Sequence, residues 1–138
     1  MPVMNLVSFT KGVEAAARRI PNEKVKRGLR GASLAAYRVA VKETPKDTGF
    51  AQYNWQTSEG APNFTTKGKY NSKKEWPTPV ASAEVPQLLK AYSTMYITNN
   101  APYIEVLNDG GIYIAPQRMV EQARLAAQAY LRGLGWKA

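Results

Sequence analysis

The chain has 138 residues and a formal net charge of +9, from 19 basic and 10 acidic residues, and it contains no cysteine and no histidine. It therefore has no disulfides and no thiolate metal ligands, and it lacks both the commonest general base and the commonest transition-metal ligand. We expect one domain, residues 1–138, that is not an enzyme and has no catalytic residue, metal or cofactor.

No stretch approaches the roughly 20 continuous apolar residues that a membrane-spanning helix needs, and no signal-peptide pattern is visible. The hydrophobic content of 44% is ordinary for a globular protein. These features predict a soluble, intracellular protein with no membrane partner and no small-molecule substrate.

The N-terminal third of the chain is predicted to be helical. A short helix that ends before Pro21 is followed by a longer one from Asn22 to Glu43. In the longer helix, apolar residues recur at spacings of four and three, which predicts one buried face: Val25, Leu29, Ala32, Ala36 and Val39. Gly28 and Gly31 weaken this prediction unless another backbone packs closely against them.

The opposite face of the longer helix is basic. Nine basic residues fall within the first 42 positions, and only Glu14 and Glu23 oppose them there. Such a stripe can contact nucleic acid or an acidic protein, although most basic helix faces are simply solvated. We expect four residues of this face to contact DNA or an acidic partner: Lys24, Arg27, Arg30 and Arg38.

The stretch TPKDTGFAQYNW, residues 44–55, joins the helix to a predicted strand. We interpret its turn-forming residues as a structural corner: Pro45, Asp47, Thr48 and Gly49. Proline disfavours helix at the residue before it, aspartate and threonine side chains bond nearby amides, and glycine tolerates a positive φ angle. After the corner, apolar and polar residues alternate over residues 51–58, which predicts a strand with one buried face.

Residues 59–84 are predicted to form a long loop, because they contain prolines and lysines and show no sustained periodicity. Loops of this length are usually functional or disordered, and disordered linkers are poor in aromatic residues. Three aromatic residues therefore predict that the loop orders against its own domain or a neighbouring chain: Phe64, Tyr70 and Trp76.

The last third alternates between helix and strand. A short helix is predicted over residues 85–91, a strand over residues 94–98 and a helical turn within residues 101–111. A last helix begins near Pro116 and is expected to bury one face: Val120, Ala123, Ala127, Tyr130 and Leu134. The sum is an α+β fold, in which a long N-terminal amphipathic helix and a C-terminal helix pack on a small, mainly antiparallel sheet with the long loop inserted.

No group of residues is typical of a catalytic site. Four carboxylates lie at turns or helix ends, and we interpret them as caps or surface charges: Glu43, Asp47, Glu105 and Asp109. The aromatic residues Tyr53, Trp55 and Tyr103 lie on apolar faces and not among the basic residues, which favours a core or interface role over base stacking.

The stretches TPKDTGFAQYNWQ, YITNNAPYIEVLNDG and APQRMV together resemble the neck and tail-completion family of tailed bacteriophages, sometimes labelled minor tail protein Z-like. The resemblance covers most of the chain and depends on the order of its parts. A basic helix, the Thr-Pro-x-Asp-Thr-Gly corner, a tryptophan strand and a variable loop come first. An asparagine-rich strand end before Pro-Tyr follows, and then Ala-Pro and Met-Val open a helix. The stretch GGIYIAP departs from the family, whose members are more polar around Ile112 and Ile114.

This resemblance implies a structural virion protein that forms a ring, expected to be a hexamer, in the phage neck. The ring would join the head connector or adaptor to the tail terminator or tail tube, with genomic DNA passing through its channel, and it would be assembled in the host cytoplasm. The corner would set the angle between the basic helix and the tryptophan strand without performing chemistry.

In such a ring we expect the loop of residues 59–84 to cross the subunit boundary, with its three aromatic side chains as anchors. One alternative is that the loop folds back over its own strand and covers Tyr53 or Trp55. The alternative for the whole protein is a basic nucleic-acid-binding module that acts outside a virion. The net charge of +9 is the observation that supports this alternative.

Overall fold

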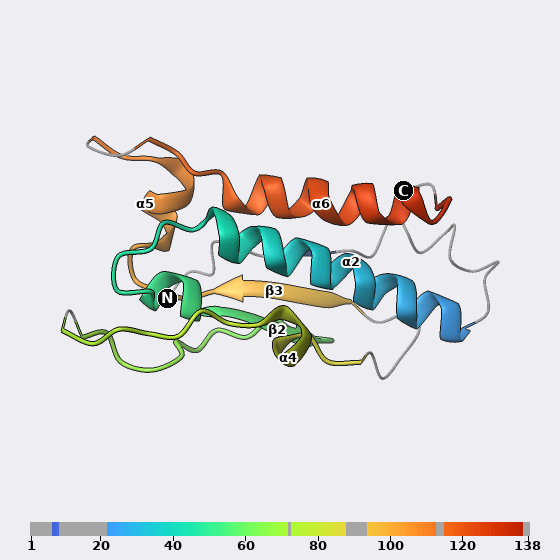
Figure 1. The fold of residues 1–138 in the computed structure, drawn as a ribbon, viewed down its shortest axis with the longest axis horizontal. Helices are drawn as coiled ribbons and strands as arrows, with labels where there is room; N and C mark the ends of the chain where they lie inside the picture. Colours follow the sequence, from blue (N-terminus) through green and yellow to red (C-terminus); the bar gives the residue numbers. More distant parts are fainter. Residues whose placement is uncertain (1–6, 9–21, 72, 88–93, 113–114, 137–138) are drawn as a thin grey trace.

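The computed structural model describes residues 7–8, 22–71, 73–87, 94–112 and 115–136. It confirms the predicted α+β fold, in which two long antiparallel helices lie against a small sheet in an elongated molecule (Figure 1). The helices are α2 (Asn22–Glu43) and α6 (Met119–Gly133). The short helix predicted before Pro21 lies outside the described residues.

The sheet has three strands in the order β1-β3-β2, and both pairings are antiparallel. The outer strands are β1 (Val7–Ser8) and β2 (Trp55–Glu59), and the central strand is β3 (Met95–Asn99), which confirms the strand predicted over residues 94–98. The register sets Trp55 opposite Asn99 and Glu59 opposite Met95.

The strand predicted from residue 51 begins only at Trp55. Residues Phe50–Tyr53 form instead a single helical turn, α3, in which the Tyr53 amide donates to the Gly49 carbonyl at 2.9 Å. Phe50, Ala51 and Gln52 are all buried, so the period-two pattern does not describe this segment. Gly49 makes the turn possible because its φ of 88° is strained for residues with a side chain.

Helix α2 has the predicted bounds, and Val25, Leu29, Ala32 and Ala36 are buried as expected. Val39 is only half-buried, and Ala40 is buried near the end of the helix. Tyr37 is also fully buried, and its hydroxyl donates to the Trp55 carbonyl at 2.8 Å. The helix is thereby bonded directly to the start of β2.

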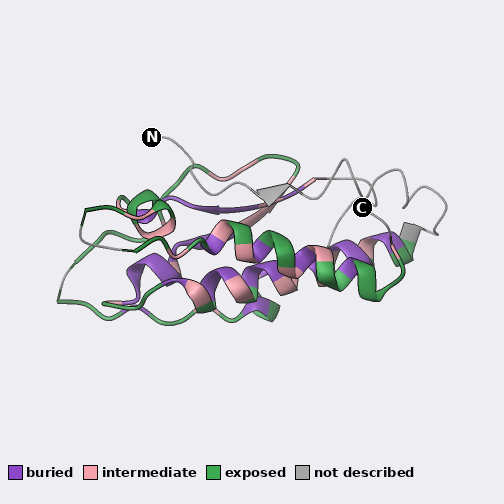
Figure 2. Cartoon of the chain, turned by 90° about the horizontal axis from the view of Figure 1, so that it is seen from above, coloured by how far each residue is buried: buried purple, intermediate pink, exposed green. Residues whose placement is uncertain are grey.

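Helix α6 packs along α2. Four residues spaced by four positions form its buried face: Met119, Ala123, Ala127 and Leu131. The prediction that Tyr130 and Leu134 belong to this buried face is wrong, because they are 40% and 49% exposed. Figure 2 shows buried residues along both long helices where they face each other and the sheet, with exposed residues on the outer sides.

The short helices are α4 (Ala81–Glu84) and α5 (Ile104–Asp109). The helix predicted over residues 85–91 is wrong at its start, because α4 ends before Val85 and residues 88–91 lie outside the described residues. Val85 precedes Pro86 and has the extended backbone, φ −96° and ψ 105°, that proline favours at the residue before it. The helical turn predicted within residues 101–111 is confirmed as α5.

Within the part of the chain that the structure describes, no helix is long and apolar enough to cross a membrane.

Candidate functional site

The corner after α2 fastens the long loop to the body of the molecule. The Trp76 amide donates to the Thr48 carbonyl at 2.8 Å, and the Thr48 hydroxyl accepts from the Phe50 amide at 3.3 Å. A Cβ on Gly49 would lie 2.7 Å from the Trp76 carbonyl oxygen, so only glycine fits there. Pro45 and Asp47 are exposed, which leaves Thr48 and Gly49 as the corner residues that contact the loop.

Thr44 links the end of α2 to the buried tryptophan of β2. Its hydroxyl donates to the Ala40 carbonyl at 2.6 Å and accepts from the Trp55 indole at 2.8 Å. The carboxamide of Gln52 donates to the carbonyls of Val41 and Thr44, both at 3.1 Å. Side chains of Thr44 and of Gln52 in α3 therefore satisfy carbonyls at the end of α2.

Trp76 packs inside its own subunit and not on a free surface. It is 7% exposed, and its ring centroid lies 5.1 Å from that of Phe50 and 4.9 Å from that of Tyr53. Lys74 lies over the Trp76 ring at 4.0 Å, and Lys67 lies over the Tyr53 ring at 4.5 Å. The expectation that Trp76 anchors a neighbouring subunit is therefore wrong, and the loop folds back over Tyr53, as the alternative stated.

The other two loop aromatics remain available to a partner. Phe64 is 59% exposed, and Tyr70 is 46% exposed while its ring contacts Phe50 and Tyr103 edge-on. Their position leaves open the prediction that they lie at a subunit interface.

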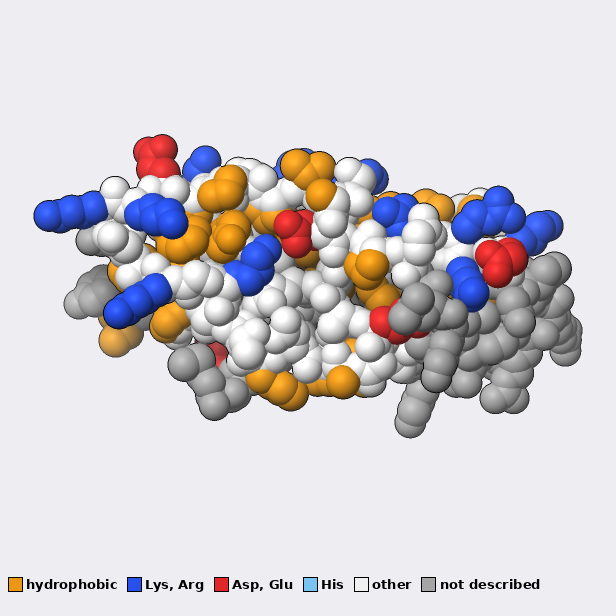
Figure 3. Space-filling model, turned by 90° about the horizontal axis from the view of Figure 1, so that it is seen from below, with side chains coloured by type: hydrophobic (Ala, Val, Ile, Leu, Met, Phe, Trp, Pro, Cys, Tyr) orange, Lys and Arg blue, Asp and Glu red, His pale blue; other side chains and the backbone are white. Residues whose placement is uncertain are grey.

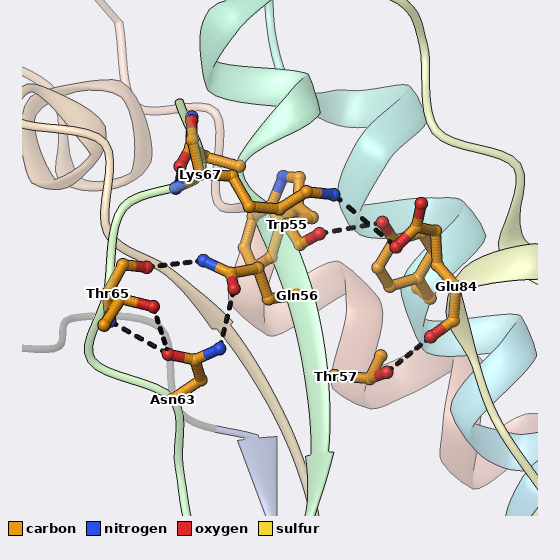
Figure 4. A network of polar contacts seen from close by, with 9 residues as sticks. Trp55, Gln56, Thr57, Asn63, Thr65, Lys67 and Glu84 are labelled. Atoms are coloured by element: carbon orange, nitrogen blue, oxygen red, sulfur yellow. Dashed lines mark hydrogen bonds and ion pairs between the residues drawn. The ribbon is translucent and has the colours of Figure 1, made fainter. Parts of the chain in front are cut away.

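A network of side-chain amides and hydroxyls holds the loop of residues 61–67 against β2 and β3 (Figure 4). Asn54 is fully buried, and it donates to the Lys67 carbonyl at 3.1 Å while accepting from the Lys67 amide at 2.6 Å. Gln56 donates to the Thr65 carbonyl at 2.6 Å and accepts from Asn63 at 2.7 Å. The loop is therefore ordered by hydrogen bonds more than by apolar burial.

The end of β3 contributes to the same network. Asn100 donates to the carbonyls of Asn63 and Thr65 at 2.9 and 3.2 Å. Asn99 donates to the Ala51 carbonyl at 2.7 Å and accepts from the Ala101 amide at 3.0 Å. Both asparagines are buried, and their positions account for the polar end of a strand whose other side chains are mainly apolar.

The three stretches that carry the family resemblance meet at one end of the molecule. The first and second are joined by the pairing of Trp55 with Asn99 and by the bond from Asn99 to Ala51. The second and third are joined by backbone bonds from Gln117 to Leu107 at 2.9 Å and from Arg118 to Asn108 at 3.1 Å. Segments far apart in the sequence therefore form one continuous hydrogen-bonded unit.

The predicted basic face of α2 is present in part. Lys24, Arg27 and Arg38 are exposed. Arg30 is not on this exposed face, because it is half-buried and donates to the Val85 carbonyl at 3.0 Å. Figure 3 shows lysine and arginine side chains at both ends of the lower side of the molecule, with hydrophobic side chains exposed between them.

Two tyrosines in structural positions have shifted pKa values. Burial raises the pKa of Tyr37 above its ordinary value of 10.0, and the charge of Glu84 acts in the same direction. Burial also raises the pKa of Tyr103, assisted by Tyr70 and Asp47 and opposed by a hydrogen bond to the Ala51 backbone. Neither phenol is poised to exchange a proton near neutral pH.

The described carboxylates are dispersed. Within residues 7–8, 22–71, 73–87, 94–112 and 115–136, no three of them lie close enough together to hold a metal ion.

No protein-family model, curated protein or solved structure matches this chain.

Two features are not predicted from the sequence: the amide network, and a groove between the start of α2 and the end of α6. The signal for the first was the unusual density of asparagine and glutamine around the two strands. The signal for the second was the pair Gly28 and Gly31 within a helix. Aromatic side chains, and not another backbone, pack against these two glycines.

Proposed function

We propose that this chain is a structural subunit of a tailed-bacteriophage virion, which assembles into a ring in the neck. The ring joins the head connector to the tail and surrounds the channel through which genomic DNA passes. The proposal includes the virion as its location and head and tail proteins as its neighbours.

The observation that supports this proposal most is that the three resembling stretches form one hydrogen-bonded unit. Side chains of these stretches make some of the contacts between them, as a shared structural role would require. Thr48, Asn99 and Asn108 belong to the resembling stretches, and each bonds the backbone of another part of the chain or of the corner. Their use is structural, which suits an assembly subunit.

The exposed charges support a position near DNA. Lys24, Arg27 and Arg38 line α2 without an acidic residue between them, and a surface of this kind attracts phosphates or an acidic protein. Half-buried Arg30 is instead part of the contact between α2 and Val85.

Electron microscopy of the purified protein without DNA tests the proposal, with mass photometry over a range of protein concentrations. We expect discrete closed rings whose mass is a fixed multiple of the 15.3 kDa chain. A protein that stays monomeric at every concentration, and binds DNA with an affinity that falls steeply as salt rises, would support the alternative of a DNA-binding module outside the virion.

A further inference from the structure

The segment from α5 to residue 112 presents an apolar side chain at the surface. Ile112 is 93% exposed, and Val106 of α5 is 49% exposed. The base of the loop is fixed, because the Asn108 carbonyl accepts from the Arg118 amide at 3.1 Å and the Asn108 side chain accepts from the Val120 amide at 3.1 Å. Burial of these exposed apolar side chains against another surface would be favourable.

This segment is also acidic. Residues 104–112 contain Glu105 and Asp109, both exposed, and no basic residue, although the chain has 19 basic residues to 10 acidic ones. We call Glu105, Val106, Asp109 and Ile112 the acidic tip.

A groove lies between the start of α2 and the end of α6. It has a volume of about 610 Å³ and is lined by Tyr130, Leu134 and Trp136, with Lys24 and Arg27 along one side. We call these five residues the basic groove. Gly28 and Gly31 leave room for it, because a Cβ there would lie 2.3 Å from the Trp136 ring and 2.2 Å from the Tyr130 hydroxyl.

The acidic tip cannot reach the basic groove of its own chain. The tip adjoins the first residue of α6 and the groove adjoins the last, and the 15 residues of this helix span about 22 Å. Figure 1 shows the loop after α5 at one end of the long axis and the end of α6 at the other.

The two surfaces are complementary in chemistry. The tip offers two exposed carboxylates and an exposed isoleucine within nine residues, and the groove offers cations beside exposed apolar side chains, Leu134 at 49% and Tyr130 at 40%. We propose that the acidic tip of one subunit binds the basic groove of a second copy of this chain, so that subunits associate head to tail.

A contact between two different surfaces of identical chains repeats, and it closes into a ring or continues as a filament. This inference rests on the proposed ring and specifies the surfaces that form it. It assigns Lys24 and Arg27 to the subunit contact and leaves Arg38 as the exposed member of the predicted set that faces DNA or an acidic partner.

Two variants test the contact in the full chain. The tip variant carries Glu105→Gln, Asp109→Asn and Ile112→Ser, which remove the tip charge without reversing it, and the groove variant carries Lys24→Glu and Arg27→Glu. All five side chains are exposed, so the fold is expected to survive, and circular dichroism checks it. The matched control carries Leu125→Ser, Lys42→Glu and Arg124→Glu, which change exposed apolar and basic residues outside both surfaces and outside the loop.

We expect each variant alone to raise the dissociation constant of assembly by about tenfold or more, as loss of charge and apolar complementarity does at interfaces, and the control to leave it unchanged. A mixture of the two variants is the decisive sample. Each tip variant keeps an intact groove and each groove variant keeps an intact tip, so the mixture should form heterodimers and stop there.

Rings or chains formed by both variants with wild-type affinity would overturn the contact while leaving the proposed ring intact. Higher oligomers in the mixture would overturn its head-to-tail form. A wild-type chain that never assembles would overturn both the contact and the proposed ring.

Discussion

At the scale of single residues, Thr44 carries the most consequence, because one hydroxyl joins the end of α2 to the buried indole of Trp55. We expect Thr44→Val to lower the free energy of unfolding by about 1–3 kcal/mol, since it leaves a buried N–H donor without a partner. Urea denaturation measures the difference. Thr44→Ser keeps the hydroxyl and is the control, and equal losses in the two variants would contradict this role.

Tyr37 predicts how stability responds to alkaline pH. Burial raises the pKa of its phenol above 10.0 in the folded state, so above pH 10 the unfolded chain releases a proton that the folded chain keeps. Stability contributed by this group is complete below pH 10 and falls as the pH rises further, by at most about 1.4 kcal/mol per pH unit.

Urea unfolding between neutral and strongly alkaline pH checks this dependence. Tyr37→Phe loses the hydrogen bond to Trp55 and should be less stable at neutral pH, but its stability should fall less steeply above pH 10. Parallel curves for the two proteins would show that Tyr37 does not cause the loss.

At the scale of elements, two glycines of α2 shape the surface that α6 completes. Alanine usually stabilises a helix relative to glycine by up to about 1 kcal/mol, and we expect this gain for Gly133→Ala, whose added Cβ meets nothing within 4 Å. Gly28→Ala should give no such gain, because its Cβ overlaps the Trp136 ring and must displace it. Thermal melting and tryptophan fluorescence measure the two effects, and an equal gain with unchanged fluorescence would contradict the packing.

Two aromatic residues of the loop between β2 and α4 are expected to contribute very differently to the stability of the monomer. Trp76→Ala should lower the free energy of unfolding by about 3 kcal/mol or more, because it removes a buried indole from its contacts with Phe50 and Tyr53. Phe64→Ala should change monomer stability by no more than about 0.5 kcal/mol, since this side chain is 59% exposed. Urea denaturation of the monomer separates them, and similar values would mean that the loop does not depend on Trp76.

The elements that could be predicted from the sequence are those whose signals are local. Helix α2 runs from Asn22 to Glu43 and ends just before the Thr44-Pro45 step, a signal that lies beside the helix in the sequence. Strand β3 shows its alternation over five residues. The turn α3 was predicted as strand because its residues are buried by contacts from elsewhere, which local alternation does not record.

The sequence predicts which residue types form the candidate site, but not which residues contact one another there. The sequence indicated that loop aromatics would order against a surface, but the partner of Trp76 depends on Thr48 and Phe50, more than 20 residues earlier in the chain. Arg30 fits the basic stripe by spacing, yet its guanidinium donates a hydrogen bond to a carbonyl 55 residues later. Contacts of this kind follow from the tertiary fold and leave no local pattern.

At the scale of the whole molecule, the absence of cysteine makes the subunit contact directly testable. A chain carrying both Ile112→Cys and Leu134→Cys should give, on oxidation, a ladder of covalent oligomers that a reductant collapses. Each single variant has one thiol and can form only dimers. Non-reducing gel electrophoresis distinguishes them, and a double variant that stops at dimers would contradict a repeating head-to-tail contact.

The amide network has a consequence for how the molecule could diversify. Asn54, Gln56 and Asn100 bind the loop mainly through its main-chain carbonyls and one main-chain amide. These backbone groups do not depend on the side chains of the loop residues. The exposed side chains of the loop, such as Phe64 and Lys69, therefore do not hold the loop in place. A lineage could exchange them to match a different neighbour while the scaffold beneath keeps its shape, in the way an antibody framework tolerates new loops.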